Sequence, residues 1–274
     1  MATRNPGHRP LPTFYRFAPL VTFLAVAVVN FLPIGERRFE DDADTLVTAA
    51  GYAFSIWGII FTGLIGFSVL LATRAEVDTP GMRRAVRGLL VAGVASILFV
   101  PISIHGDQLL GFLDVAAHLV ALIYAYGGLR EHVRTAPPQS RKVRFWFYGP
   151  SMYLGWISAA TVIAASLALE QLGFRVSDQV ALVLALVLVT VLFNVGSRFL
   201  AHADAVYGLT VAWALVGVGV EQLEVPLLPW ACFVGAGLLV VSFVIRLARR
   251  EFAFYATPGY YEEADAIIES LRSE

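Results

Sequence analysis

Long apolar stretches with few or no charged residues alternate with shorter polar connections along this chain, and the pattern predicts helices that cross a membrane. A hydrocarbon core about 30 Å thick takes about 20 helical residues. The run AAGYAFSIWGIIFTGLIGFSVLL, residues 49–71, reaches that length without a charged side chain. We distinguish eight such stretches: Phe17–Pro33, Thr48–Ala72, Gly88–Ile104, Gln108–Leu129, Phe147–Leu169, Gln179–Val195, Asp204–Val220 and Leu228–Leu247. The expected fold class is therefore all-α, a polytopic membrane helical bundle of eight transmembrane helices, with a tight hairpin between the third and fourth.

The placement of basic residues tests this count, because cytoplasmic connections are rich in Lys and Arg. When alternate connections are assigned to one side, all basic residues except Arg37, Arg38 and Arg175 lie on the side of the N-terminal segment. A miscounted span in the middle of the chain would destroy this alternation. We therefore expect both the N- and C-termini to be cytoplasmic.

Composition agrees with a membrane protein and narrows its partners. The chain is 58% hydrophobic and 15% charged, well below the roughly 25% charged residues of soluble domains. Its net charge of −1 gives no reason to expect nucleic acid as a partner, whereas the lipid bilayer is one. The single cysteine, Cys232, lies in an apolar run, so we expect core packing and no intrachain disulfide.

Two polar segments have simple interpretations. The acidic connection Ile34–Leu46 is expected to be a solvated outer loop, and an acidic metal-binding loop is a weaker alternative because no fixed Ca²⁺-loop spacing occurs there. After the last span, residues 260–272 place Ala264, Ile267, Ile268 and Leu271 on one helix face. This spacing predicts a short amphipathic helix in a cytoplasmic tail, packed under the bundle.

Few ionisable side chains lie inside the spans, and such residues are functional candidates by default. Asp114 and His118 lie four residues apart on one helix face, within reach of each other. They could relay a proton or hold a polar ligand, or they could be a buried pair that pins helices together; the sequence leaves both open. The five histidines are scattered, so we expect no metal site. Motifs of ATP-driven pumps and soluble hydrolases are absent, and nothing in the sequence demands an enzyme.

The second span begins with aromatic residues separated by small ones. Phe54 and Trp57 share a helix face, and Tyr52 precedes them in the first turns of the same span. Such a stretch is typical of helix packing with an aromatic belt at the membrane interface. The alternative is an aromatic wall for a flat ligand.

The segment Ala49–Phe61 resembles the second helix of the TspO/MBR family, the tryptophan-rich sensory or translocator proteins. Ala49-Ala50 stands at the family's Pro-Pro, and Tyr52 and Ile56-Trp57-Gly58 match its aromatic and Trp positions. Further similarities follow in order over residues 17–170. They are Phe99-Val-Pro101-Ile at the end of the third helix, Asp114 at an acidic position of the fourth, and Tyr153-Leu-Gly-Trp156-Ile-Ser-Ala-Ala160 in the fifth.

The resemblance implies a compact bundle with a pocket near helices one, two and five that takes a porphyrin or another flat hydrophobic small molecule, haem included, with no firm cofactor. Carried over, the ligand-binding residues would be Tyr52, Phe54, Trp57, Tyr153 and Trp156, with Asp114 as polar support. Family members have five helices, so residues 1–170 would form a TspO-like bundle, 171–248 three additional helices and 249–274 the cytoplasmic tail.

Three functions follow from these observations. The first is ligand binding with a sensory or transport role in a bacterial plasma membrane, with a homodimer left open. The second is a proton-coupled secondary transporter that uses Asp114 and His118, although no inverted repeat is found. The third, ranked last, is turnover of a bound tetrapyrrole.

Overall fold

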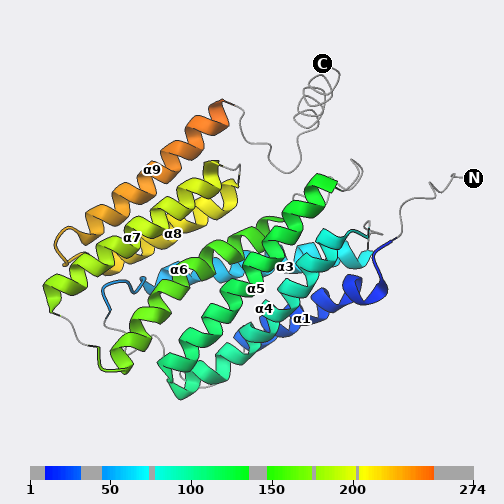
Figure 1. Ribbon diagram of the computed structural model, residues 1–274, viewed down its shortest axis with the longest axis horizontal. Coiled ribbons are helices and arrows are strands. Elements are labelled where there is room, and N and C mark those ends of the chain that lie inside the picture. Colours follow the sequence, from blue (N-terminus) through cyan, green and yellow to red (C-terminus); the bar gives the residue numbers. More distant parts are fainter. Residues whose placement is uncertain are drawn as a thin grey trace, which may run out of the picture.

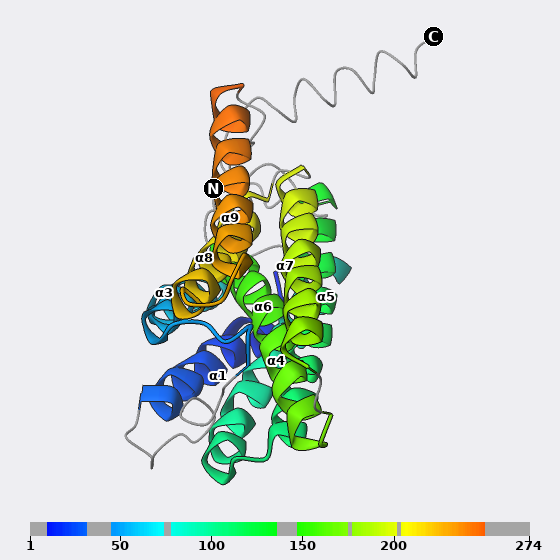
Figure 2. The ribbon, with the colours of Figure 1, turned by 90° about the vertical axis from the view of Figure 1, so that its left-hand side faces the viewer.

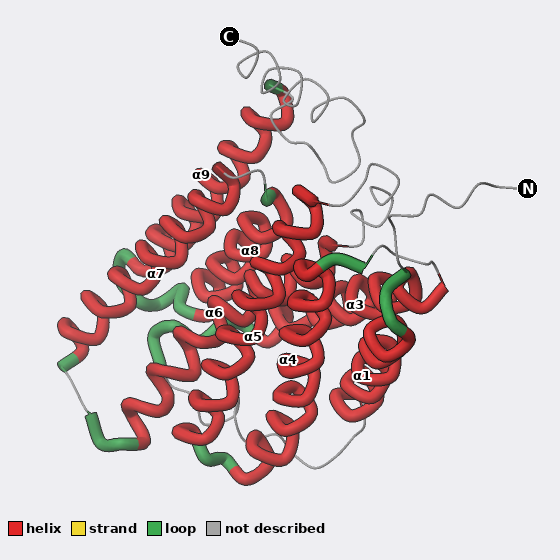
Figure 3. The backbone as a smooth tube through the Cα atoms, turned by 45° about the vertical axis from the view of Figure 1, so that its right-hand side comes forward, coloured by secondary structure: helices red, strands yellow, loops and turns green. Residues whose placement is uncertain are grey.

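The protein is helical wherever its structure is described. The computed structural model describes residues 10–31, 45–73, 78–135, 147–174, 177–201 and 204–249, and these ranges hold no β-strand. Figure 3 shows the helices joined by loops. Their bounds are α1 Thr13–Phe31, the 3₁₀ helix η1 Gly51–Ser55, α3 Ile56–Thr73, α4 Pro80–His105, α5 Gln108–Thr135, α6 Tyr148–Gln171, α7 Asp178–Ala201, α8 Ala205–Glu221 and α9 Leu228–Ala248.

The helices form two groups that meet at α6 and α8 (Figure 1). In the first group, α1 packs on α3 and α4, α4 on α5, α5 on α6, and α6 on α3, so five helices close into a ring. In the second group, α7, α8 and α9 pack on one another. Figure 2 shows α9 at the top of the view and α1 and α4 toward the bottom. Because α8 contacts both α6 and η1, it joins the two groups.

Small residues let neighbouring backbones approach closely, as is common between membrane helices. A Cβ added at Gly63 of α3 would lie 2.7 Å from the Gly149 Cα of α6. A Cβ added at Gly81 of α4 would lie 2.6 Å from the Gly128 carbonyl oxygen of α5. Larger side chains at these positions would force the helices apart.

The predicted hairpin between the third and fourth helices is present. Helix α4 ends at His105, and Gly106 follows with φ 71°, a left-handed conformation that suits glycine. The Gly106 N–H donates to the Ile102 carbonyl and closes the helix end. Helix α5 then begins at Gln108, so α4 and α5 form an antiparallel hairpin.

The sequence prediction of an all-α membrane bundle is confirmed in its coarse form. Seven helices of the described chain are long and apolar enough to cross a membrane. Helix α8 is apolar but has only 17 residues, so the count of eight crossings stays a prediction. Several helices extend past the predicted spans. For example, α4 starts at Pro80 rather than Gly88, because Thr79 caps its N-terminus by accepting a bond from the Met82 N–H at 3.0 Å.

Some predictions lie outside the described residues. The acidic connection is described only from Thr45 onward, and the amphipathic helix predicted at 260–272 is not described. The division of the chain at residue 170 also stays a prediction.

Arginines in the described ranges gather at one end of the bundle. At this end α1, α4, α6 and α8 begin and α3, α5, α7 and α9 end. Arg16 near the start of α1, for example, donates to the Ala72 carbonyl at the end of α3 at 2.8 Å. The arginines are Arg16, Arg83, Arg84, Arg87, Arg130, Arg134, Arg198, Arg246 and Arg249.

Candidate ligand-binding site

Aromatic rings from α3, η1 and α6 meet inside the ring of five helices. The Trp57 ring lies 5.7 Å from that of Tyr153 and 6.4 Å from that of Trp156, both edge to face. Phe54 of η1 contacts Trp156 at 5.4 Å, and Phe61 stacks on Trp57 at 5.2 Å. We call these five residues the aromatic cluster. The rings of the second and fifth predicted spans therefore point toward each other rather than to opposite sides of the bundle.

The cluster has a buried side and a more open side. Tyr153 and Trp156 are buried at 1% and 2% exposure, whereas Phe54 and Trp57 are only partly buried. The Tyr153 hydroxyl donates to the Ala92 carbonyl of α4 at 3.4 Å. Helix α6 thus supplies a fixed wall, and η1 with the start of α3 supplies the accessible one.

Tyr52 lies apart from the aromatic cluster. It is 44% exposed and contacts the Trp213 ring of α8 edge to face at 5.7 Å. It is the one residue of the sequence-predicted binding set that the structure does not bring next to Trp57 and Trp156.

Helix α8 holds the segment that carries Tyr52 and Phe54. The Ala50 N–H donates to the Gly217 carbonyl at 3.0 Å, and the Trp213 Nε1–H donates to the Ala53 carbonyl at 2.9 Å. A Cβ added at Gly217 would lie 2.7 Å from the Ala53 Cβ, so glycine is needed for this approach. Sequence reasoning missed this support. The available signal was a tryptophan and a glycine four residues apart on an apolar helix.

Asp114 and His118 adjoin the buried side of the aromatic cluster. The His118 ring lies 6.0 Å from that of Tyr153. His118 Nδ1 is 3.2 Å from the Asp114 backbone carbonyl and 3.2 Å from its Oδ2. The hydrogen-bond geometry favours the carbonyl, and Oδ2 receives no hydrogen bond from any residue in the described ranges. A carboxylate buried to 8% exposure thus keeps an acceptor available next to the rings.

An apolar cavity lies on the other side of Trp156, between α6, α7 and α8. Its volume is about 20 Å³. That is room for about one water molecule, so no flat macrocycle fits without movement. Its other lining residues are Val47, Ala49, Ala159, Ala160, Val162, Ile163, Leu188, Val189, Leu192, Ala214, Leu215 and Val218. The resemblance implies a pocket near α1, α3 and α6, whereas this cavity lies toward α7 and α8.

Asp204, the first residue of the predicted span Asp204–Val220, is a second buried acid. It is 2% exposed and caps α8, accepting a bond from the Tyr207 N–H at 3.0 Å. Its Oδ2 also accepts from the Tyr126 hydroxyl at 2.6 Å, and the Ser151 hydroxyl lies 2.8 and 2.7 Å from its two oxygens. We call these four residues the Asp204 node. It joins α5, α6 and α8 at the end of the bundle that carries the arginines.

Metal binding has no support in the part of the chain that the structure describes, where no group of three or more His, Cys, Asp or Glu side chains could hold an ion.

Comparison with known proteins points to one family. A family model described as TSPO-like protein matches residues 13–245, from α1 to near the end of α9. The match therefore includes α7, α8 and α9 as well as the five helices over which the sequence resemblance was drawn. Comparison with curated proteins and with solved structures finds no match.

Proposed function

This chain belongs to the TSPO-like protein family, and we propose that it binds a flat hydrophobic ligand, a porphyrin or a similar ring system, at the aromatic cluster within the bilayer. The observation that carries the proposal is the contact of Trp57 with both Tyr153 and Trp156. Aromatic contacts add about 0.5–1.5 kcal/mol each beyond the area they bury. A planar ligand whose faces contacted these rings, in place of the present contacts between the rings, would retain this stabilisation.

Binding at this cluster requires side chains to move, because the rings already fill the space between α3 and α6. We infer that the moving part is η1 with Phe54, since Trp156 is fully enclosed and Phe54 is only partly buried. Displacement of Phe54 from Trp156 would open one ring face to a planar ligand. The cavity that Trp156 lines has room for about one water molecule and would allow only a small shift of that indole.

Asp114 and His118 would serve the polar edge of the ligand. They adjoin Tyr153. The Asp114 Oδ2 can accept a hydrogen bond from a ligand, because no described residue donates one to it. A pyrrole N–H is a donor of the kind such an acceptor binds. A mostly apolar site with few directed polar groups is typical of small-molecule pockets.

We further propose that all eight of the described α-helices cross the membrane, that both termini are cytoplasmic, and that the protein acts in a bacterial plasma membrane as a sensor or transporter of its ligand. The gathering of the described arginines at one end of the bundle supports this orientation. Helix α8, at about 26 Å, is short for a span but is enclosed by α6, α7 and α9.

The test is quenching of tryptophan fluorescence by protoporphyrin IX in detergent. We expect saturable quenching in the native protein and at least tenfold weaker binding in Trp57→Phe/Trp156→Leu. Phe offers the ligand a smaller ring than Trp57, and Leu offers no ring in place of Trp156. Trp230→Phe is the matched control, because Trp230 is 71% exposed on α9 and away from the cluster. Unchanged affinity in the double variant would reject the site.

A proton-coupled secondary transporter is the second candidate. The observation that favours it is that Asp114 Oδ2 lies next to His118 and receives no hydrogen bond from a described residue. In proteoliposomes, a pH gradient should then drive ligand uptake, and Asp114→Asn should abolish the gradient dependence. Uptake that Asp114→Asn leaves intact would exclude this mechanism.

A further inference from the structure

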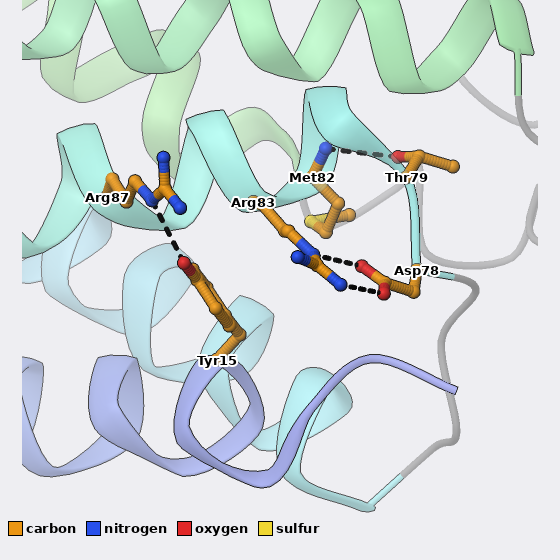
Figure 4. A network of polar contacts seen from close by, with 6 residues as sticks. All are labelled: Tyr15, Asp78, Thr79, Met82, Arg83 and Arg87. Carbon is orange, nitrogen blue, oxygen red and sulfur yellow. Dashed lines mark hydrogen bonds and ion pairs between the residues drawn. The ribbon is translucent and has the colours of Figure 1, made fainter. Parts of the chain in front are cut away.

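Three arginines occupy the first turns of α4, and their charges are met differently. Arg83 Nε donates to Asp78 Oδ1 at 2.6 Å, and its Nη2 pairs with Oδ2, so this charge is neutralised by a two-point ion pair (Figure 4). Arg87 is exposed, and its Nε donates to the Tyr15 hydroxyl of α1 at 2.9 Å (Figure 4). A hydroxyl is a neutral acceptor and leaves the charge of Arg87 in place.

Arg84 points toward α5. Its guanidinium lies 4.6 Å from the centre of the Tyr124 ring, and its Nη1 is 4.0 Å from Glu131 Oε2, too far for a hydrogen bond. Its buried Nε donates to no residue of the described chain. A Cβ added at Gly127 would lie 3.0 Å from Nη2, so the glycine leaves a recess for the guanidinium. The Arg84 side chain as a whole is 42% exposed, so it can still donate to a further acceptor.

Arg84 and Arg87 lie three residues apart, on one side of α4 and near one depth. They are about 6 and 10 Å from the start of α4, at the end of the bundle where the described arginines gather. This is the level of the lipid headgroups, and the planar guanidinium binds phosphate through two parallel hydrogen bonds. From this geometry, we propose that Arg84 and Arg87 bind the phosphate of an anionic phospholipid.

The surface that continues from the two arginines is suited to acyl chains. On α4, Val91, Val94 and Leu98 follow Arg87 at intervals of three and four residues and are 52–56% exposed. On α5, Val120 and Leu113 continue the exposed side of Tyr124 and are 68% and 54% exposed. Close packing of Gly88 against Ala125 keeps the two helices together, so the stripes form one rigid apolar face below the charges. A free phosphate ion would use the arginines but not this face.

The experiment titrates lipid against the full-length protein in neutral detergent and counts bound lipids by native mass spectrometry. We expect phosphatidylglycerol to bind more tightly than phosphatidylcholine, and Arg84→Gln/Arg87→Gln to weaken phosphatidylglycerol about tenfold or more. Gly127→Leu should also weaken it, because the added side chain fills the recess of Arg84 while every charge remains.

The matched control is Arg134→Gln/Arg198→Gln, which removes the same charge from the same end of the bundle but from the ends of α5 and α7. It should change affinity less than about twofold. Equal weakening in both double variants would overturn the proposal in favour of net charge alone. Equal binding of phosphatidylcholine would also overturn it, as would displacement of the lipid by glycerol phosphate at the same concentration, which would indicate a site for phosphate only.

Discussion

Asp204 and Asp114, two acids whose side chains are buried in the described part of the bundle, have opposite surroundings. Asp204, at 2% exposure, accepts bonds from two hydroxyls and from the first turn of α8. Asp114, with its side chain at 8% exposure, has an Oδ2 that receives no bond from the described residues, and its neighbour His118 bonds to a backbone carbonyl instead.

This difference separates a structural carboxylate from one available for function. A fully bonded buried group stabilises the packing around it, whereas an incompletely bonded one is a liability to the fold. Asp204 joins helices from both groups. Asp114 lies beside the aromatic cluster, where a ligand could supply the donor that the described protein does not.

The largest expected effect is that of Asp204→Ala. The substitution removes the cap of α8 and leaves the hydroxyls of Tyr126 and Ser151 without their acceptor. We expect the free energy of unfolding to fall by about 3 kcal/mol, measured by thermal or denaturant unfolding in detergent. A loss below about 1 kcal/mol would show that the node does not carry the contact between α8 and the five-helix ring.

Tyr126→Phe should have an intermediate effect. It deletes one hydroxyl that donates to a carboxylate and keeps the ring, so we expect a loss of about 1–2 kcal/mol in the same assay. Tyr124→Phe, two residues away on the exposed side of α5, is the control and should lie within about 0.5 kcal/mol of the native protein. Similar losses in the two variants would mean that the hydrogen bond to Asp204 adds nothing.

The smallest effect on stability is expected for Asp114→Asn, within about 0.5 kcal/mol, because the changed oxygen loses no hydrogen bond. The same change at Asp204 should cost about 2 kcal/mol, since the new amide N–H₂ would face the Tyr126 and Ser151 donors. Unfolding of the two Asn variants side by side is the measurement. Equal losses would erase the distinction between the two acids.

The sequence predicted most of the helices because each is encoded locally. A predominantly apolar run of membrane length forms a helix whatever its neighbours, and every predicted span overlaps a helix of the described chain. The i, i+4 spacing likewise predicted that Asp114 and His118 would be neighbours. Helix ends were less accurate, since a cap such as Thr79 extends α4 into polar sequence.

Contacts between distant segments could not be predicted from periodicity. The proximity of Trp57 to Trp156 was expected only through the family resemblance, and ligand binding there stays a prediction. The bonds of Tyr126 and Ser151 to Asp204 and the bonds between α8 and the η1 segment join residues that are 53 to 167 positions apart, and no local pattern encodes them. Tyr52, placed in the binding set by alignment, instead contacts Trp213.

The bonds between η1 and α8 have a consequence for biogenesis. Ala50 and Ala53 are buried, and each bonds to a partner in α8 that the ribosome makes about 160 residues later. Until Trp213 and Gly217 have been synthesised and inserted, the N–H of Ala50 and the carbonyl of Ala53 lack these partners, which is costly in an apolar medium. The segment that carries Tyr52 and Phe54 therefore gains its final hydrogen bonds only after α8 has been inserted, and a nascent chain that stops after α7 would lack them.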